Sequence, residues 1–318
     1  MEHRSIGKTD IKISPILMGT WQAGRKDWIG IDDQVSTRAI QTAFEVGITA
    51  FDTAEAYGKG HAERILGNAL AHVRKQVVYI TKVSPNHLKR DQVLQACHRS
   101  LKNLRTDYID LYMVHWPSGS WRTKTIPIEE TLSAMNELKQ QDKIRAIGVS
   151  NFSLAQLKEA ARYTTIESLQ PPYSLFWRHV EGDSMPYCLK NDITLLAYSP
   201  MAQGLLTGKF APSYEFDRND NRHRNRLFRG DNARRAQDAL AKLRPIAERN
   251  NLTLGQLALA WIIAQPGTSA VAGARNEGQV RQNAMAAEAH LSEDDLKEMD
   301  VIGRTVTDPM DDNPIMWD

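Results

Sequence analysis

Four residues of this chain could together deliver a proton to a reacting oxygen. Asp52, Lys82 and His115 each stand directly after a short apolar run, and Tyr57 lies five residues beyond Asp52. A charged lysine after an apolar run is costly to bury alone, so we expect Lys82 to pair with the Asp52 carboxylate. If Tyr57 lies beside this pair, the ammonium would favour the phenolate and lower the pKa of Tyr57. Tyr57 would then act as a general acid.

His115 could donate a hydrogen bond to the oxygen that Tyr57 protonates. Such an acid suits an oxygen whose carbon receives a hydride. Simpler structural interpretations also exist. Asp52 and Lys82 could form a stabilising ion pair, Tyr57 could be a surface tyrosine, and His115 could be a core histidine. The joint placement of these residues at the ends of apolar runs and in a loop favours catalysis.

Eight apolar runs, each followed by a helical pattern or by a loop and a helical pattern, could bring these residues to one site. The runs cover residues 16–18, 48–51, 77–81, 109–114, 144–149, 168–170, 193–197 and 270–272. Eight such units predict an α/β fold, a closed (β/α)8 or TIM barrel. An open doubly wound sheet would usually carry G-x-G-x-x-G after its first strand, where this chain has GTWQAG. We therefore predict one barrel domain over residues 1–318, with its chemistry at the C-terminal ends of the strands.

Two segments lie outside this repeat. Residues 2–14 are expected to form an N-terminal hairpin with its turn at residues 7–10. Residues 202–235 form a long connection rich in Gly, Asn and Arg, which is typical of a functional or disordered loop. We expect the long loops to lie at the C-terminal face of the barrel, where they could shape a binding site.

The composition excludes several classes of protein. The 318 residues hold 40 Lys and Arg against 38 Asp and Glu, which gives no global reason to expect a nucleic-acid or membrane partner. Two cysteines cannot form a disulfide framework, and no cluster of His, Cys, Asp and Glu has metal-site spacing. The chain shows no secretory signal at its start and no run near the roughly 18 apolar residues of a membrane span. We therefore expect a cytoplasmic protein with no bound metal.

Six segments carry a resemblance to a known family. They are GITAFDTAEAYG (47–58), YITKV (79–83), DLYMVHWP (110–117), IGVSNFS (147–153), LLAYSPMAQGLLTGK (195–209) and VAGARNEGQVRQN (271–283). In this order they resemble the aldo-keto reductase superfamily over essentially the whole chain. GTW at 19–21 and the long loop at 202–235 are similar to members related to bacterial general-stress reductases and potassium-channel β-subunits. The resemblance implies a catalytic tetrad of Asp52, Tyr57, Lys82 and His115, all present without substitution.

The same resemblance implies that NADPH binds in an extended form across the barrel mouth. Ser150, Asn151 and Gln170 match the residues that hold the nicotinamide carboxamide, and Tyr198 matches the aromatic residue that stacks on its ring. The other contacts that it implies are Gly19, Thr20, Trp21, Asp52, Ser199, Pro200 and Met201; Gly204, Leu206 and Lys209 near the pyrophosphate; and Gly273, Ala274, Arg275, Gln279, Gln282 and Asn283 around the adenosine phosphate.

Two positions bear on the choice between NADPH and NADH. Arg275 is the candidate contact for the 2′-phosphate, because a guanidinium suits a phosphate dianion and no acidic residue occupies that motif position. Gln279 is a departure, since many members carry an arginine there. The basic run at 221–229 is expected to be a solvated loop, with a lid over the cofactor phosphates as the second interpretation.

We therefore expect an NADPH-dependent reductase of small aldehydes or ketones, acting as a monomer or weak homo-oligomer. Trp21, Trp28, Trp116 and Trp121 lie in expected mouth loops and could line an apolar substrate pocket, with at least one of them expected to serve packing alone. One alternative is a regulatory or redox-sensing subunit that binds NADPH and turns over slowly. Another is a barrel aldolase that uses Lys82 as a Schiff-base nucleophile, against which the expected Asp52 partner argues.

Overall fold

Eight parallel strands close into a barrel in a computed structural model that describes residues 1–25, 28–211, 214–311 and 313. Around the barrel the strand order is β10-β3-β4-β5-β6-β7-β8-β9. The strands are β3 (Ile16–Gly19), β4 (Ala50–Asp52), β5 (Val78–Val83), β6 (Ile109–Val114), β7 (Ile144–Ser150), β8 (Ser168–Gln170), β9 (Thr194–Tyr198) and β10 (Thr268–Gly273). Each predicted apolar run contributes to one of them, so the predicted (β/α)8 barrel is confirmed.

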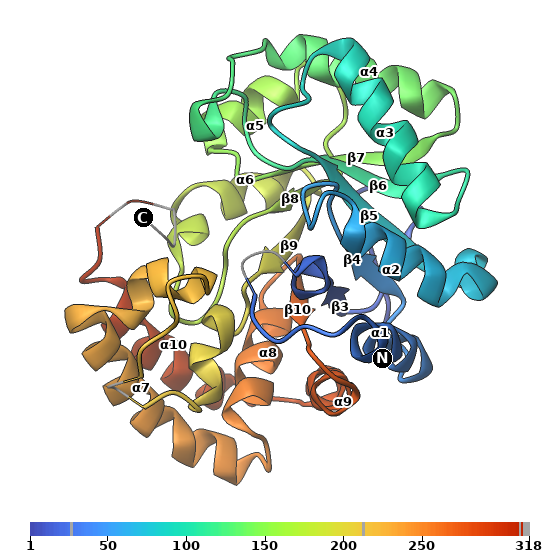
Figure 1. The fold of residues 1–318 in the computed structure, drawn as a ribbon. Helices are drawn as coiled ribbons and strands as arrows, with labels where there is room; N and C mark the ends of the chain where they lie inside the picture. The colour runs from blue at the N-terminus through green and yellow to red at the C-terminus, as the bar shows by residue number, and fades with distance from the viewer. Residues whose placement is uncertain (26–27, 212–213, 312, 314–318) are drawn as a thin grey trace.

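Helices surround the barrel, as Figure 1 shows. They are α1 (Asp33–Glu45), α2 (His61–Leu70), α3 (Arg90–Leu104), α4 (Ile128–Gln140), α5 (Leu154–Ala160), α6 (Ser184–Lys190), α8 (Leu254–Ala264) and α9 (Glu277–Met285). Their buried faces pack on the outward side chains of the strands, such as Tyr79 and Tyr112, and make the larger hydrophobic core. This core fixes the barrel from outside.

A second, smaller core fills the inside of the barrel. It contains Ile80, Leu111, Met113 and Leu196 from strands β5, β6 and β9. Because side chains two residues apart in a strand point to the same side, the positions that follow at +2 also face inward, one layer nearer the C-terminal ends. Strand geometry therefore places Lys82, His115 and Tyr198 at the barrel mouth, and it does the same for Asp52, two residues after Ala50.

The predicted N-terminal hairpin closes the opposite end of the barrel. Strand β1 (Arg4–Ser5) pairs antiparallel with β2 (Lys12–Ile13). Ile6, Ile11 and Ile13 of this hairpin belong to the inner core and are at most 2% exposed. The hairpin thus covers the end of the barrel away from the residues at the mouth.

The connection after β9 is more regular than the sequence suggested. It contains the 3-10 segments η5 (Ala202–Thr207), η6 (Asn221–Arg224) and η7 (Arg226–Phe228), and then α7 (Gly230–Arg249). The prediction of an irregular segment through residue 235 is therefore wrong from residue 230 onward. The helix was overlooked because its first turns are polar, and its buried positions recur every three or four residues only from Ala236.

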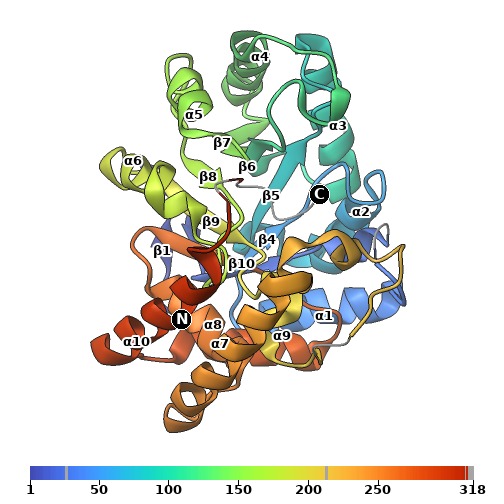
Figure 2. The ribbon, with the colours of Figure 1, turned by 90° about the vertical axis from the view of Figure 1, so that its left-hand side faces the viewer.

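The last helix, α10 (Glu293–Thr307), packs against α7. Figure 2 shows the two helices beside each other on one side of the barrel. Beyond α10 the structure describes only residues 308–311 and 313. Among the described residues, no helix combines the length and the apolar character that crossing a membrane requires.

Candidate active site

A buried ion pair lies at the base of the barrel mouth. Lys82 has no exposed surface, and its Nζ donates to Asp52 Oδ1 at 2.6 Å and to the backbone carbonyl of Thr53 at 2.8 Å. Strands β4 and β5 are neighbours, so the register brings the two side chains together. The carboxylate partner expected for Lys82 is thus present, which offsets the cost of burying its charge.

Tyr57 and His115 lie above this pair. Their rings meet edge to face with centroids 5.5 Å apart, and Lys82 Nζ lies 5.4 Å from the centroid of the Tyr57 ring. Trp21 stacks on the other side of Tyr57 at 6.2 Å. The residues of the implied tetrad, which are up to 63 positions apart in sequence (52 to 115), therefore lie together at one end of the cavity.

The electrostatics of Tyr57 correct one expectation. Burial raises the pKa of Tyr57 well above its ordinary value, and the charge of Asp52 raises it further. Lys82 was expected to lower the pKa of Tyr57, but burial outweighs its effect. The ammonium is already paired with Asp52, and a buried phenolate is poorly solvated. Tyr57 therefore keeps its proton at neutral pH and can donate it.

His115 is neutral at the same pH. Burial lowers the pKa of His115 well below its ordinary value, and the positive charge of Lys82 lowers it further. A neutral imidazole carries one N–H donor. Nδ1 of His115 is buried without a partner among the described residues. Burial also lowers the pKa of Lys82, and the Asp52 carboxylate opposes that shift.

The residues matched to the nicotinamide carboxamide form a connected hydrogen-bond network. Ser150 Oγ donates to the Gln170 carbonyl at 2.8 Å, and Asn151 Nδ2 donates to Ser150 Oγ and to the His115 carbonyl, each at 3.0 Å. The Tyr198 hydroxyl donates to Asn151 Oδ1 at 2.8 Å. The structure thus brings the four residues together and orients their polar atoms from strands β7, β8 and β9.

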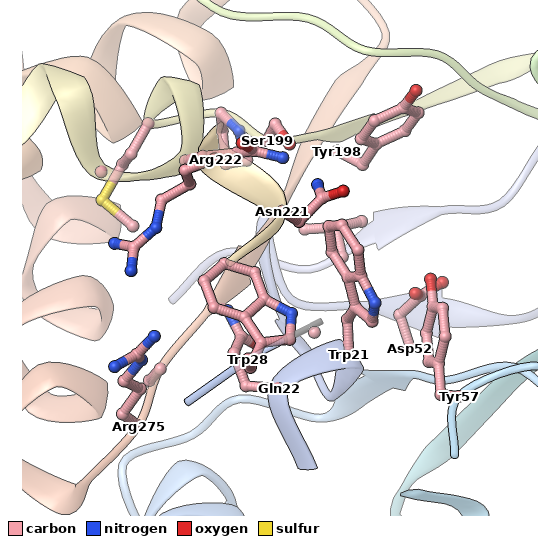
Figure 3. A pocket seen from close by; sticks show the side chains of 18 of the residues that line it. Trp21, Gln22, Trp28, Asp52, Tyr57, Tyr198, Ser199, Asn221, Arg222 and Arg275 are labelled. Atoms are coloured by element: carbon pink, nitrogen blue, oxygen red, sulfur yellow. The ribbon is translucent and has the colours of Figure 1, made fainter. Parts of the chain in front are cut away.

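The other end of the cavity is basic. Figure 3 shows the guanidinium groups of Arg222 and Arg275 turned toward each other beside Trp28, whose ring lies 5.3 and 5.2 Å from the two guanidinium carbons. Lys209 lines the same cavity, and burial together with the positive charges of Arg222 and Arg275 lowers its pKa. Arg222 forms a bidentate pair with Asp220, with Nη2 to Oδ2 at 2.5 Å. Three cations that repel one another, beside one carboxylate, make a site for a ligand with several negative charges.

The cavity that joins the two ends has a volume of about 1130 Å³. All the residues implied as cofactor contacts line it except Thr20 and Leu206, which are buried beneath its wall. Four N–H groups in the wall are buried without partners among the described residues, and they belong to Trp28, Gln203, Asn221 and Arg275. Donors without acceptors suit an acceptor-rich ligand, so the wall fits the phosphates of a dinucleotide.

Sequence reasoning missed part of this basic end. Arg222 was included in a run expected to be solvated, yet it is only 8% exposed and lies 4.6 Å from the Phe216 ring. The lid over phosphates, kept as the second interpretation, describes this residue better. Trp28, expected in the substrate pocket, lines the cavity, where its ring lies beside both arginines and 5.3 Å from the ring of Trp21. Asp220 lies directly before the basic run and pairs with Arg222. It is the sequence feature that could have indicated a buried arginine there.

Aromatic side chains surround the tetrad on the side away from the arginines. Trp116 and Trp121 meet edge to face with centroids 5.1 Å apart, and both line the cavity. Trp121 is 54% exposed, so its ring leaves apolar surface open beside His115. These tryptophans and Trp21 fit the expected apolar pocket. No group of three or more His, Cys, Asp and Glu side chains suited to a metal occurs in the described part of the chain.

Comparison with known proteins agrees with this geometry. A sequence model of the Aldo/keto reductase family matches residues 15–304. Aldo-keto reductase YhdN of Bacillus subtilis is 38% identical over 98% of this chain and 96% of its own length. The NADH-specific methylglyoxal reductase of Escherichia coli is 34% identical, over 93% and 96%. A probable voltage-gated potassium channel subunit beta of Arabidopsis thaliana is 32% identical, over 91% and 92%.

Solved structures agree as well. The glycerol dehydrogenase AKR11B4 from Gluconobacter oxydans superimposes with a TM-score of 0.88 at 32% identity, with 97% of each chain covered. An aldo-keto reductase from Klebsiella pneumoniae, solved in complex with NADPH, has a TM-score of 0.78 at 28% identity, over 100% of this chain and 99% of that one. This chain therefore belongs to the aldo/keto reductase family of oxidoreductases.

Proposed function

We propose that this protein reduces aldehydes and ketones to alcohols with NADPH. One observation carries the proposal: a protonated phenol beside a buried ion pair lies at one end of the cavity, and a cluster of three cations lies at the other. A dinucleotide that extends between the two ends would place its phosphates among the cations and its nicotinamide near Tyr57. When bound, NADPH supplies a hydride.

Each residue of the tetrad has a role in this proposal. Tyr57 donates its proton to the carbonyl oxygen, and the neutral imidazole of His115 holds that oxygen through its N–H group. Lys82 stabilises the negative charge that develops on Tyr57 as its proton leaves. Asp52 keeps Lys82 charged and in place. The aromatic wall next to His115 binds the apolar part of the substrate.

The preference for NADPH over NADH rests on the basic end of the cavity. The guanidinium of Arg275 stands at the motif position of the 2′-phosphate contact, and Arg222 and Lys209 add two further charges. A phosphate dianion would relieve the repulsion among these groups. The relatives differ in cofactor, since one is named NADH-specific and another was solved with NADPH. The preference therefore needs a direct test.

The two alternatives differ in their support. A slowly turning-over redox sensor gains support from the similarity to plant channel β-subunits, and comparison of single-turnover with steady-state rates separates it from an enzyme. An aldolase is disfavoured, because Lys82 has no exposed surface and Nζ is bonded to Asp52 and to the Thr53 carbonyl. A cytoplasmic location, one domain over residues 1–318 and a monomer or weak homo-oligomer stay predictions from the sequence.

Substitution of Tyr57 tests the proton donor. We expect Tyr57→Phe to lower the rate of carbonyl reduction by roughly 100- to 10,000-fold, because the phenol proton is lost while the ring remains. NADPH affinity, measured by quenching of protein fluorescence, should stay within about 2-fold, since only the hydroxyl is removed. Tyr163→Phe, at an exposed position, is the matched control. Full activity of Tyr57→Phe would contradict the mechanism.

The pH dependence of carbonyl reduction follows from the directions of the pKa shifts. The raised pKa of Tyr57 keeps the phenol protonated, and the lowered pKa of His115 keeps the imidazole neutral. We therefore expect kcat/KM to be flat from about pH 6 to 8 and to fall only at alkaline pH, as Tyr57 ionises. A break near the ordinary pKa of histidine that disappears in His115→Phe would contradict this assignment.

Substitution of Arg275 tests the cofactor preference. We expect Arg275→Glu to lower kcat/KM for NADPH by roughly 10- to 100-fold and to change the value for NADH far less, because the charged partner of the 2′-phosphate is lost. A panel of aldehydes and ketones that includes methylglyoxal, assayed with both cofactors, provides the measurement. Arg234→Glu, at an exposed position of α7, is the control. An unchanged preference in Arg275→Glu would show that Arg275 does not bind the 2′-phosphate.

A further inference from the structure

Both oxygens of the buried Asp52 carboxylate accept a hydrogen bond from a side chain. Oδ1 accepts from Lys82 Nζ at 2.6 Å, and Oδ2 accepts from Gln170 Nε2 at 2.8 Å. Asp52 and Gln170 are each 3% exposed. The carboxylate thus has a charged donor on one side and a neutral amide on the other, which fixes its orientation as well as its position.

Gln170 is itself fixed by the strands around it. It is the last residue of β8 and pairs in register with Ser150 of β7. Its carbonyl oxygen accepts from Ser150 Oγ at 2.8 Å and from the backbone N–H of Asn151 at 3.2 Å. Since Asn151 Nδ2 also donates to the carbonyl of His115, the same hydrogen-bond network continues to the end of β6. The Gln170 amide is therefore presented to Asp52 by a rigid support.

A neutral donor suits this position because it strengthens an ionised carboxylate without adding a charge. If the amide were removed, Oδ2 would be a buried acceptor without its partner. The carboxylate could then rotate. Nζ of Lys82 would move with it, because Nζ donates the short hydrogen bond to Asp52 Oδ1. Nζ is the ammonium that lies 5.4 Å from the Tyr57 ring centroid. Gln170 can therefore act on Tyr57 indirectly, through Asp52 and then Lys82.

We infer that Gln170 is a positioning residue for the Asp52 and Lys82 pair, in addition to any contact that it makes with the cofactor. The side chain also lines the cavity, at the position matched to the nicotinamide carboxamide. One glutamine thus links the site of the hydride donor with the proton donor. This inference rests on the proposed function and deepens it, because it assigns Gln170 an effect on the proton donor through Asp52 and Lys82.

The experiment separates this role from a contact with the carboxamide alone. Gln170→Met keeps the length of the side chain and removes its donor. The reductants are NADPH and the reduced 3-acetylpyridine analogue of NADPH, in which a methyl group replaces the carboxamide NH2. Single-turnover hydride transfer to an aldehyde that the wild-type protein reduces, and the Kd of each reductant, are measured for both proteins. Gln141→Leu removes an exposed amide at the end of α4 and is the matched control.

The expected result is a loss in the hydride-transfer step that persists with the analogue. Gln170→Met should slow single turnover by roughly 10- to 100-fold with both reductants, because a hydrogen bond to a charged group is lost. Its Kd for the analogue should stay within about 2-fold of the wild-type value, since Gln170 Nε2 already donates to Asp52 and the analogue lacks the NH2 group that the Gln170 side-chain oxygen would accept from. Gln141→Leu should match wild type in every measurement.

Two outcomes would overturn the inference. A Gln170→Met protein that matches wild type in single turnover with the analogue would show that Gln170 serves the carboxamide alone. If Gln170→Met does not fold, Gln170→Asn, whose amide is one methylene too short to reach Asp52, is measured instead, and normal turnover by it would also overturn the inference. A wild-type protein that binds NADPH and transfers hydride to no carbonyl would instead overturn the proposed function, and the two failures are thus distinguishable.

Discussion

The ammonium of Lys82 has no contact with solvent, and the active end of the cavity is organised around it. A charge buried in this way requires a partner, and removal of one member of such a pair typically costs about 3–5 kcal/mol. Asp52 meets the requirement from the neighbouring strand, and the Thr53 carbonyl accepts a second hydrogen bond. Because the pair is fixed, the Tyr57 phenol has a constant electrostatic environment. The Lys82 ammonium lies near its ring, and the Asp52 carboxylate is paired with that ammonium.

The cavity has two electrostatic ends that suit the two ends of one cofactor. At the end of the cavity that holds the tetrad, the charges of Lys82 and Asp52 balance each other and are buried, and Tyr57 and His115 are neutral. At the far end, Lys209, Arg222 and Arg275 exceed the single charge of Asp220. Under the proposed function, this asymmetry would favour one direction of a dinucleotide across the mouth, with its phosphates at the cationic end.

The sequence predicted the residues that strand geometry controls. Their position directly after apolar runs of a predicted barrel was enough to place Asp52, Lys82 and His115 at the mouth, and in the structure each follows an inward-facing apolar residue at +2. Tyr57 was proposed from its place in the loop after Asp52, and the resemblance supplied the residues along the cofactor site. What the sequence could not predict depends on contacts across long loops. The burial of Arg222 against Trp28 and the direction of the Tyr57 pKa shift both require knowledge of which groups exclude water.

A double-mutant cycle on Asp52 and Lys82 tests the central claim, that the carboxylate acts on the proton donor through the ammonium. Single-turnover hydride transfer from NADPH to an aldehyde is measured for wild type, Asp52→Asn, Lys82→Met and the double variant, with thermal unfolding as a check of the fold. If Asp52 acts only through Lys82, the double variant is no slower than Lys82→Met alone. Losses that multiply in the double variant would contradict the account, because each residue would then act independently.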